Sequence, residues 1–156
     1  MTARHTLVAL LSAAVLAGCV GAPGPAQSTP AGGTRNAPIV IRNDHGGNVA
    51  ANILRREQLA NSGREVQLRG FCDSACTMFT TLPNACLAPD ATFGFHAPSI
   101  GGSSTPAPMV GDLIGQFYRN GIARKWQQSW GNSTKITRIS AKRYVQLDPQ
   151  ARLCTR

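Results

Sequence analysis

Short apolar runs alternate with stretches of helical periodicity along the chain from residue 39 onward. Residues 39–41 form a β-branched run that is typical of a buried strand. Asn48 can cap a helix, and Val49 and Ile53 then recur at helical spacing. A second short strand is expected at residues 66–68. This order of strand, helix and strand predicts parallel pairing with a right-handed crossover.

The remaining pattern continues the alternation. A tight turn after residue 70 leads into a helix that opens near Ser74 and ends before Pro83. The pattern then predicts a bent strand over 86–87 and 91–95, followed by a loop over 98–108. An apolar helical stripe follows from Leu113 to Trp130, where Asn120 offers a break, and a last helix is expected over 140–147. The expected fold class is therefore α/β, with a short, mostly parallel sheet and crossover helices. Active sites in such sheets gather beyond the carboxyl ends of the strands.

The N-terminus has the pattern of an export signal. An apolar run over residues 7–17 follows Arg4, and it is too short to span a bilayer, which needs about 20 residues. It ends in Leu-Ala-Gly-Cys at residues 16–19, which resembles the lipobox of bacterial lipoproteins. An ordinary secretory signal with a chance cysteine is the alternative.

The lipobox resemblance implies a lipid anchor and a compartment. Residues 1–18 would be the signal peptide, and Cys19 would become the first residue and carry two acyl chains, which anchor a protein stably. Val20 in the next position implies the periplasmic face of the outer membrane. Residues 19–37 are rich in Gly, Pro, Ala, Ser and Thr and predict a flexible tether, so the folded domain is expected over 38–156.

The charge of the chain is strongly positive. The 156 residues contain 16 Lys and Arg against 7 Asp and Glu, a formal net charge of +9. From Leu113 onward the chain has nine basic residues and one acidic residue, Asp148. This excess predicts a positive surface that an anionic envelope surface would attract. Aromatic residues are only 6% of the chain, so a stacking platform for nucleic acid is not expected.

Four cysteines remain once Cys19 is assigned to the anchor: Cys72, Cys76, Cys86 and Cys154. An even number in an oxidising compartment predicts two disulfides, for which three pairings exist. We favour Cys72–Cys76 with Cys86–Cys154. A zinc site is the alternative, but the Cys-x₃-Cys spacing departs from the common patterns, and no metal or other cofactor is expected.

Three motifs together resemble a known family. Residues 39–49 resemble the strand–Asn-x-x-Gly-Gly–helix entry of the Clp serine protease proteolytic subunit and its crotonase-like relatives. Residues 70–76 resemble the nucleophile turn of that family, and residues 93–98 resemble the strand end that bears its catalytic His. A closer resemblance is to small secreted bacterial proteins with a Cys-x-Ser-Ala-Cys core and a Gly-Phe-His-Ala strand end. The family's first strand–helix unit is missing, which implies a sheet of three or four strands.

The resemblance implies a serine hydrolase site. Ser74 would be the nucleophile and His96 the base that takes its proton, because a Ser hydroxyl is a poor nucleophile until it is deprotonated. The backbone N–H groups of Gly47 and Ala75 would stabilise the oxyanion. His45 is a further candidate base near the oxyanion donors, and an exposed loop histidine is the alternative. Ser74 as a simple helix cap and His96 as a structural histidine are the alternatives.

The acid of a catalytic triad has no clear match. The family places an Asp just before its late helix, but residues 132–138 contain no acidic residue. Asp148 lies 52 residues after His96 and matches by count only, and Asp73 and Asp112 have no motif support. Two functions therefore remain open: a peptidase-like serine hydrolase, and a non-catalytic envelope module on a degenerate protease scaffold. The oligomeric state is not predicted.

Overall fold

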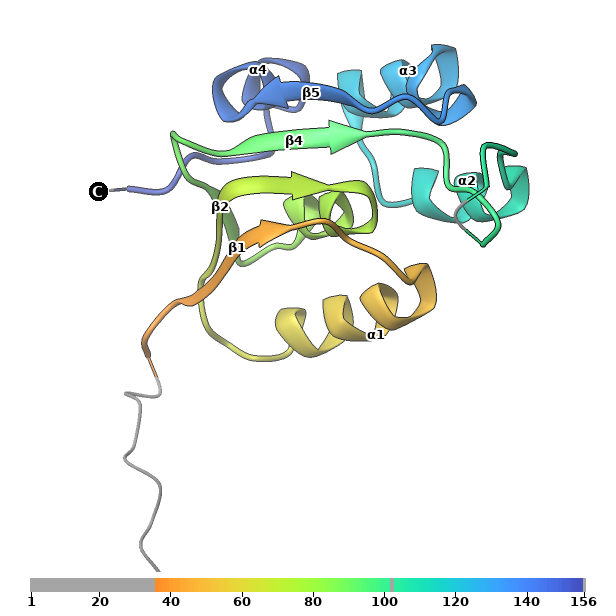
Figure 1. Ribbon diagram of the computed structural model, residues 1–156. Coiled ribbons are helices and arrows are strands. Elements are labelled where there is room, and N and C mark those ends of the chain that lie inside the picture. The colour runs from red at the N-terminus through yellow and green to blue at the C-terminus, as the bar shows by residue number, and fades with distance from the viewer. Residues whose placement is uncertain (1–35, 102, 156) are drawn as a thin grey trace, which may run out of the picture. The chain divides into compact units, whose positions relative to one another are not determined.

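The computed structural model describes residues 36–101 and 103–155. The predicted signal peptide, Cys19 and most of the predicted tether lie outside these residues. The described part is a mixed α/β structure, in which helices pack against a five-stranded sheet (Figure 1). None of its helices combines the length and apolar character that a bilayer crossing requires.

The sheet is mostly parallel, as predicted. Its main path runs β1 (Ile39–Asp44), β2 (Val66–Asp73), β4 (Thr92–Phe95) and β5 (Thr137–Ser140), and β3 (Ala85–Leu87) pairs with β2. The strands β1, β3 and β4 are each parallel to β2, whereas β5 is antiparallel to β4. The expected bent strand is thus two strands, and β5 raises the count above the three or four expected.

Within the described residues, six helices connect and cover the strands: α1 (Val49–Ala60), the 3₁₀ helix η1 (Ser74–Thr81), α2 (Pro108–Gly115), α3 (Asn120–Gln128), the 3₁₀ helix η2 (Trp130–Asn132) and α4 (Ala141–Leu147). Asn48 caps α1 by accepting a hydrogen bond from the N–H of Ala51. The break expected near Asn120 separates α2 from α3. The segment expected as one ordinary helix from Ser74 is instead the tighter 3₁₀ form.

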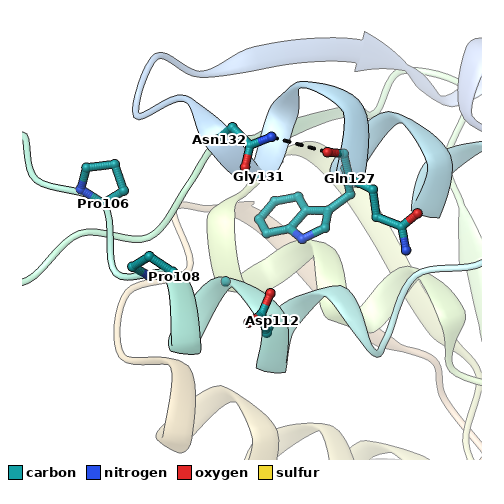
Figure 2. A pocket seen from close by; sticks show the side chains of 8 residues that line it. Pro106, Pro108, Asp112, Gln127, Gly131 and Asn132 are labelled. Carbon is teal, nitrogen blue, oxygen red and sulfur yellow. Dashed lines mark hydrogen bonds between the residues drawn. The ribbon is translucent and has the colours of Figure 1, made fainter.

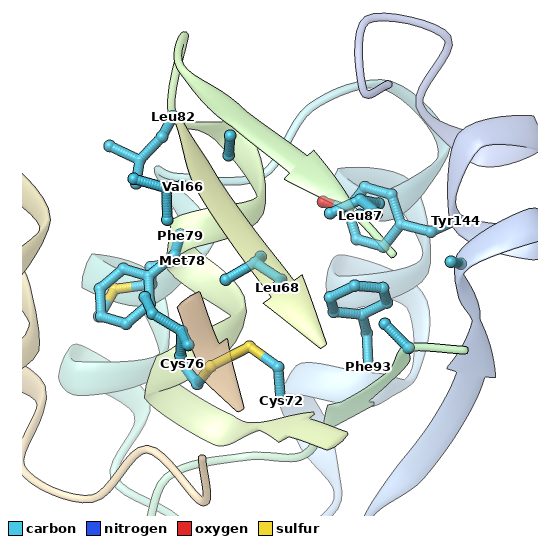
Figure 3. Close-up of a cluster of buried hydrophobic side chains, with 14 of the residues drawn as sticks. Val66, Leu68, Cys72, Cys76, Met78, Phe79, Leu82, Leu87, Phe93 and Tyr144 are labelled. Atoms are coloured by element: carbon cyan, nitrogen blue, oxygen red, sulfur yellow. A yellow bond between two sulfur atoms is a disulfide. The ribbon is translucent and has the colours of Figure 1, made fainter. Parts of the chain in front are cut away.

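The core lies on one face of the sheet. Leu68 and Phe93 point from the strands toward Met78, Phe79 and Tyr144, and all five side chains are fully buried (Figure 3). The opposite face of β1 and β2 is exposed or half-buried; it carries Val40, Arg42, Gln67 and Arg69. The described residues therefore form a two-layer structure with one open sheet face, whereas parallel sheets are usually covered on both faces.

Both disulfides have the pairing favoured from the sequence. Cys72–Cys76 joins the end of β2 to η1 and spans Ser74. Cys86–Cys154 ties the C-terminal segment to β3, where Leu153 also forms a parallel bridge with Leu87. All four cysteines are therefore engaged, and none is available as a thiolate ligand for zinc.

Candidate active site

The carboxyl ends of the parallel strands border a cavity that contains the principal candidate residues. Gly47, Ser74 and His96 line one pocket of about 440 Å³. The β1–α1 turn supplies Gly47, the β2–η1 turn supplies Ser74, and the residue after β4 supplies His96. The other lining residues are Asn48, Val49, Ala50, Pro98, Ser99 and Val110. Residues far apart in sequence thus meet where the sheet topology predicts.

Ser74 sits on a sharp turn between a strand and a helix. Its φ of 55° lies in the left-handed region, which a residue other than glycine adopts rarely and at a cost. The Cys72–Cys76 bridge spans this turn, and the Ser74 carbonyl accepts a hydrogen bond from the Thr77 hydroxyl at 2.6 Å. These bonds hold the strained turn in place. The side chain of Asp73, at the cap position of η1, makes no capping bond to the helix.

The Gly46–Gly47 turn packs directly on the Ser74 turn. Both glycines have positive φ, 82° and 88°. A Cβ on Gly46 would lie 2.5 Å from the backbone N of Ala75 and 2.7 Å from the carbonyl O of Asp73, so only glycine permits this approach. Ala75 is fully buried at the start of η1 and does not line the cavity, although it directly follows Ser74. The two predicted oxyanion positions therefore lie on two turns that contact each other.

Asn52 is a site residue that the sequence analysis did not identify. It is buried on α1, and its Nδ2 donates to the carbonyls of Gly46 at 3.0 Å and Asn48 at 2.9 Å. In a trans peptide the C=O of one residue and the N–H of the next point in opposite directions. By holding the Gly46 carbonyl, Asn52 fixes the direction of the Gly47 N–H. The only signal in the sequence is an amide among the inward positions of an amphipathic helix.

His96 is half-buried and is held through one ring nitrogen. Its Nδ1 lies 2.8 Å from the carbonyl O of Ala97. A carbonyl only accepts, so this contact assigns the proton to Nδ1 and leaves Nε2 as the acceptor. Within the described part of the chain, no hydrogen bond joins the His96 ring to the Ser74 hydroxyl. Such bonds are often loose in unliganded sites and tighten when substrate binds.

The structure does not bring Asp148 to His96, which corrects the expectation from residue count. Asp148 is completely buried at the end of α4. Its carboxylate accepts hydrogen bonds from Arg119 at 2.9 Å and 3.1 Å and from Asn120 at 2.7 Å. A buried carboxylate needs such partners to offset the loss of water. Asp148 therefore fixes the start of α3.

Asp73 is also engaged elsewhere. Its buried carboxylate accepts two hydrogen bonds from Arg138 on β5, at 2.7 Å and 3.2 Å. This carboxylate fills the space where Gly94 would carry a side chain, and its hydrogen bonds raise the pKa of Arg138. His45 Nδ1 lies 3.7 Å from the same carboxylate, while the His45 ring is largely exposed and lies tilted by 37° against the Phe71 ring. His45 does not line the cavity that holds Ser74.

Residues 36–101 and 103–155 contain no cluster of three or more His, Cys, Asp or Glu side chains that could hold an ion. The cavity brings together a hydroxyl, an imidazole with a free acceptor nitrogen, and the backbone of Gly47, and Ala75 directly follows Ser74. These groups are the components of acyl transfer through a Ser–His pair.

Part of the basic excess is neutralised by ion pairs. Arg119, Arg138 and Arg152 pair with Asp148, Asp73 and Glu65. Five of the late basic residues are exposed and outside these pairs: Arg124, Lys125, Lys135, Lys142 and Arg143. The positive surface expected from the sequence is thus smaller than the count of nine implied.

Comparisons with known proteins give no family for this chain: no protein-family model matches it, and no curated protein matches it significantly.

Proposed function

We propose that this chain is a serine hydrolase, peptidase-like in mechanism, on a small scaffold of the Clp protease and crotonase type. One observation carries the proposal: Ser74, His96 and Gly47 line the same cavity, although they come from three separate turns. The left-handed backbone of Ser74 supports it, because strained residues of this kind concentrate at active sites. The resemblance of the three sequence motifs points to the same chemistry.

The reaction would proceed through an acyl-enzyme. His96 Nε2 takes the proton of the Ser74 hydroxyl as the oxygen attacks the substrate carbonyl. The N–H groups of Gly47 and Ala75 stabilise the oxyanion, and His96 returns the proton to the leaving amine or alcohol. In the second half of the reaction, His96 takes a proton from water as the water attacks the acyl-enzyme. The proton then passes to the Ser74 oxygen, and the carboxylic acid product leaves. The Ala97 carbonyl accepts from His96 Nδ1 and so takes the place that the acid has in a catalytic triad.

A fluorophosphonate probe tests this function. The probe should label Ser74 in the folded parent protein, and Ser74→Ala should abolish the label. His96→Ala should slow labelling by about 100- to 10,000-fold, the usual contribution of a general base. Ser129→Ala is the matched control, because Ser129 is exposed at the end of α3 and away from the cavity, and it should label like the parent.

The histidines separate the possible outcomes. His45→Gln should leave the rate of labelling unchanged, whereas an effect as large as that of His96→Ala would assign the base to His45. Absence of labelling in the folded parent would refute the hydrolase. The non-catalytic envelope module would then be the better explanation, since no acid orients His96 and no hydrogen bond joins it to Ser74 in the part of the chain that the structure describes.

The proposed location is the cell envelope. Lipidation of Cys19 would anchor the domain by its N-terminal tether at the periplasmic face of the outer membrane. There the exposed basic residues of α3 and α4 would face anionic envelope material. Metabolic labelling with a fatty acid tests the anchor. The parent should carry label and Cys19→Ala should not, and equal label in both would exclude the lipobox.

A further inference from the structure

Two further cavities lie beside α2 and α3, and the larger, which η2 also borders, is shown in Figure 2. The larger has a volume of about 400 Å³ and the smaller about 230 Å³. Asp112, Trp126 and Gln127 line both cavities, which therefore adjoin. We call this pair the α2–α3 groove. Pro106 and Pro108 form one rim of the larger cavity, and Asn132 lines another side.

Trp126 is fixed in this groove with its ring nitrogen unpaired. A Cβ on Gly115 would lie 2.8 Å from the indole Nε1, and a Cβ on Gly131 would lie 2.9 Å from the same atom. The two glycines thus let the backbone pack closely against the indole, which is 6% exposed. The indole N–H has no acceptor among the described residues. The indole Nε1 is not among the fully buried polar atoms of the described residues, so its N–H is open to the groove and can donate to a ligand.

The other polar groups of the groove indicate the chemical class of a ligand whose acceptor would meet the Trp126 N–H. Asp112 is exposed and forms no ion pair with a described residue, so it presents a negative charge at the groove. The side-chain amide of Gln127 adds both a donor and an acceptor. Asn132 Nδ2 already donates to the backbone carbonyl of Gln127 at 3.2 Å. The groove therefore offers one fixed donor, one adaptable amide and one carboxylate.

The groove is next to the cavity that holds Ser74. Consecutive residues of α2 line the two sites: Val110 lines the Ser74 cavity and Gly111 lines the groove. A Cβ on Gly111 would lie 3.6 Å from Pro98, which lines the Ser74 cavity, and 4.0 Å from the Trp126 ring. The two sites thus lie on either side of the helix α2. Three extended residues span about 10 Å, roughly the diameter of a helix, so one chain can reach both.

We propose that the α2–α3 groove is a peptide subsite that selects a Lys or Arg side chain of the substrate. The Trp126 N–H would donate to a substrate backbone carbonyl, Gln127 would bond the adjoining peptide group, and Asp112 would pair with the basic side chain. An anionic ligand would meet the Asp112 charge, and a sugar ring would need an open indole face, which close packing against Gly115 and Gly131 restricts. This inference rests on the proposed hydrolase and names its substrate class.

Binding of blocked tripeptides to the folded protein tests the subsite without requiring hydrolysis. The probes are acetyl-Ala-Lys-Ala-amide, its norleucine analogue and its Glu analogue. The readout is the NMR resonance of the Trp126 indole N–H, which Trp126→Phe assigns because the chain has only two tryptophans. The Lys peptide should shift this resonance saturably and bind about three- to fivefold more tightly than the norleucine peptide, as expected for one exposed ion pair.

Three variants complete the test. Asp112→Asn should bring the affinities of the Lys and norleucine peptides together, whereas Asp90→Asn, at an exposed aspartate of the β3–β4 turn, should keep the difference. Ser74→Ala should bind like the parent, so loss of the hydrolase proposal and loss of the subsite are separate results. Equal affinity for the Lys and Glu peptides, or no shift of the indole resonance at millimolar peptide, would overturn the subsite.

Discussion

At the scale of single residues, the candidate site consists of side chains that line the cavity and of groups that hold the surrounding turns. Ser74 and His96 stand in short motifs, and both line the same cavity. Asn52 has no such marker, because only the folded turn shows that its amide reaches the Gly46 carbonyl. Asp148 was placed near His96 by counting residues. Its contact with Arg119 is set by the packing of α3 on α4, which spacing alone does not predict.

Asn52 provides a test of positioning at this scale. Asn52→Leu keeps a similar volume but removes the donor that fixes the Gly46–Gly47 peptide. Fluorophosphonate labelling of Ser74 should slow by about 10- to 100-fold, less than the 100- to 1,000-fold typical for complete loss of an oxyanion donor. The free energy of unfolding, measured in urea, should fall by about 1–3 kcal/mol because the Gly46 carbonyl loses its donor, while the Asn48 carbonyl keeps its bond from the Asn52 backbone N–H. Labelling is compared in the absence of urea, where the variant remains folded.

Gln58→Leu on the exposed side of the same helix is the control, and it should change neither quantity by much. Asn52→Leu that loses stability yet labels at the parental rate would show that Asn52 supports α1 only and does not position the Gly47 amide.

At the scale of elements, the strands and helices with strong periodicity were predictable, and the exceptions have local causes. In η1 the hydroxyls of Thr77 and Thr80 each donate to a carbonyl three residues earlier, which favours the tighter 3₁₀ turn over the ordinary helix expected. The strand β5 has four residues and lies at the edge of the sheet, too short a segment to show an alternating pattern. Its pairing with β4 is set by the tertiary structure.

The two disulfides also act on different elements. In the loop-entropy account, the short Cys72–Cys76 ring contributes about 2 kcal/mol, and the much longer loop closed by Cys86–Cys154 contributes about 4 kcal/mol. The first bridge braces the turn that presents Ser74, and the second holds the C-terminal segment against β3.

At the scale of the whole molecule, the mixed α/β class with parallel strands was predictable, but the one-sided layering was not. All the packed helices contribute to a core on one face, where Phe95 contacts the aromatic rings of Tyr118, Trp130 and Tyr144. Arg42 and Arg69 are paired directly across β1 and β2 on the other face. Periodicity identifies which side of an element is apolar, but it does not show how many helices share that side.

The buried tyrosines make the stability of the whole domain fall as the pH rises into the alkaline range. Burial raises the pKa of both Tyr118 and Tyr144, whose hydroxyls bond to Thr77 and Thr80 inside the core. Because the folded pKa lies above the unfolded value of about 10, stability is fully present below pH 10 and is lost as the pH rises above it. Urea unfolding of the parent should therefore give a free energy that falls steadily from about pH 10 upward.

The double variant Tyr118→Phe, Tyr144→Phe removes both titrating phenols, and these are the only tyrosines in the chain. It should be less stable than the parent near neutral pH, by about 1 kcal/mol for each lost hydrogen bond. Above pH 10 its free energy of unfolding should fall less steeply, because unfolding no longer releases two phenolic protons. The two proteins differ only in these two phenols, so the comparison isolates their contribution. The same slope in the parent and the double variant would show that other groups govern the alkaline transition.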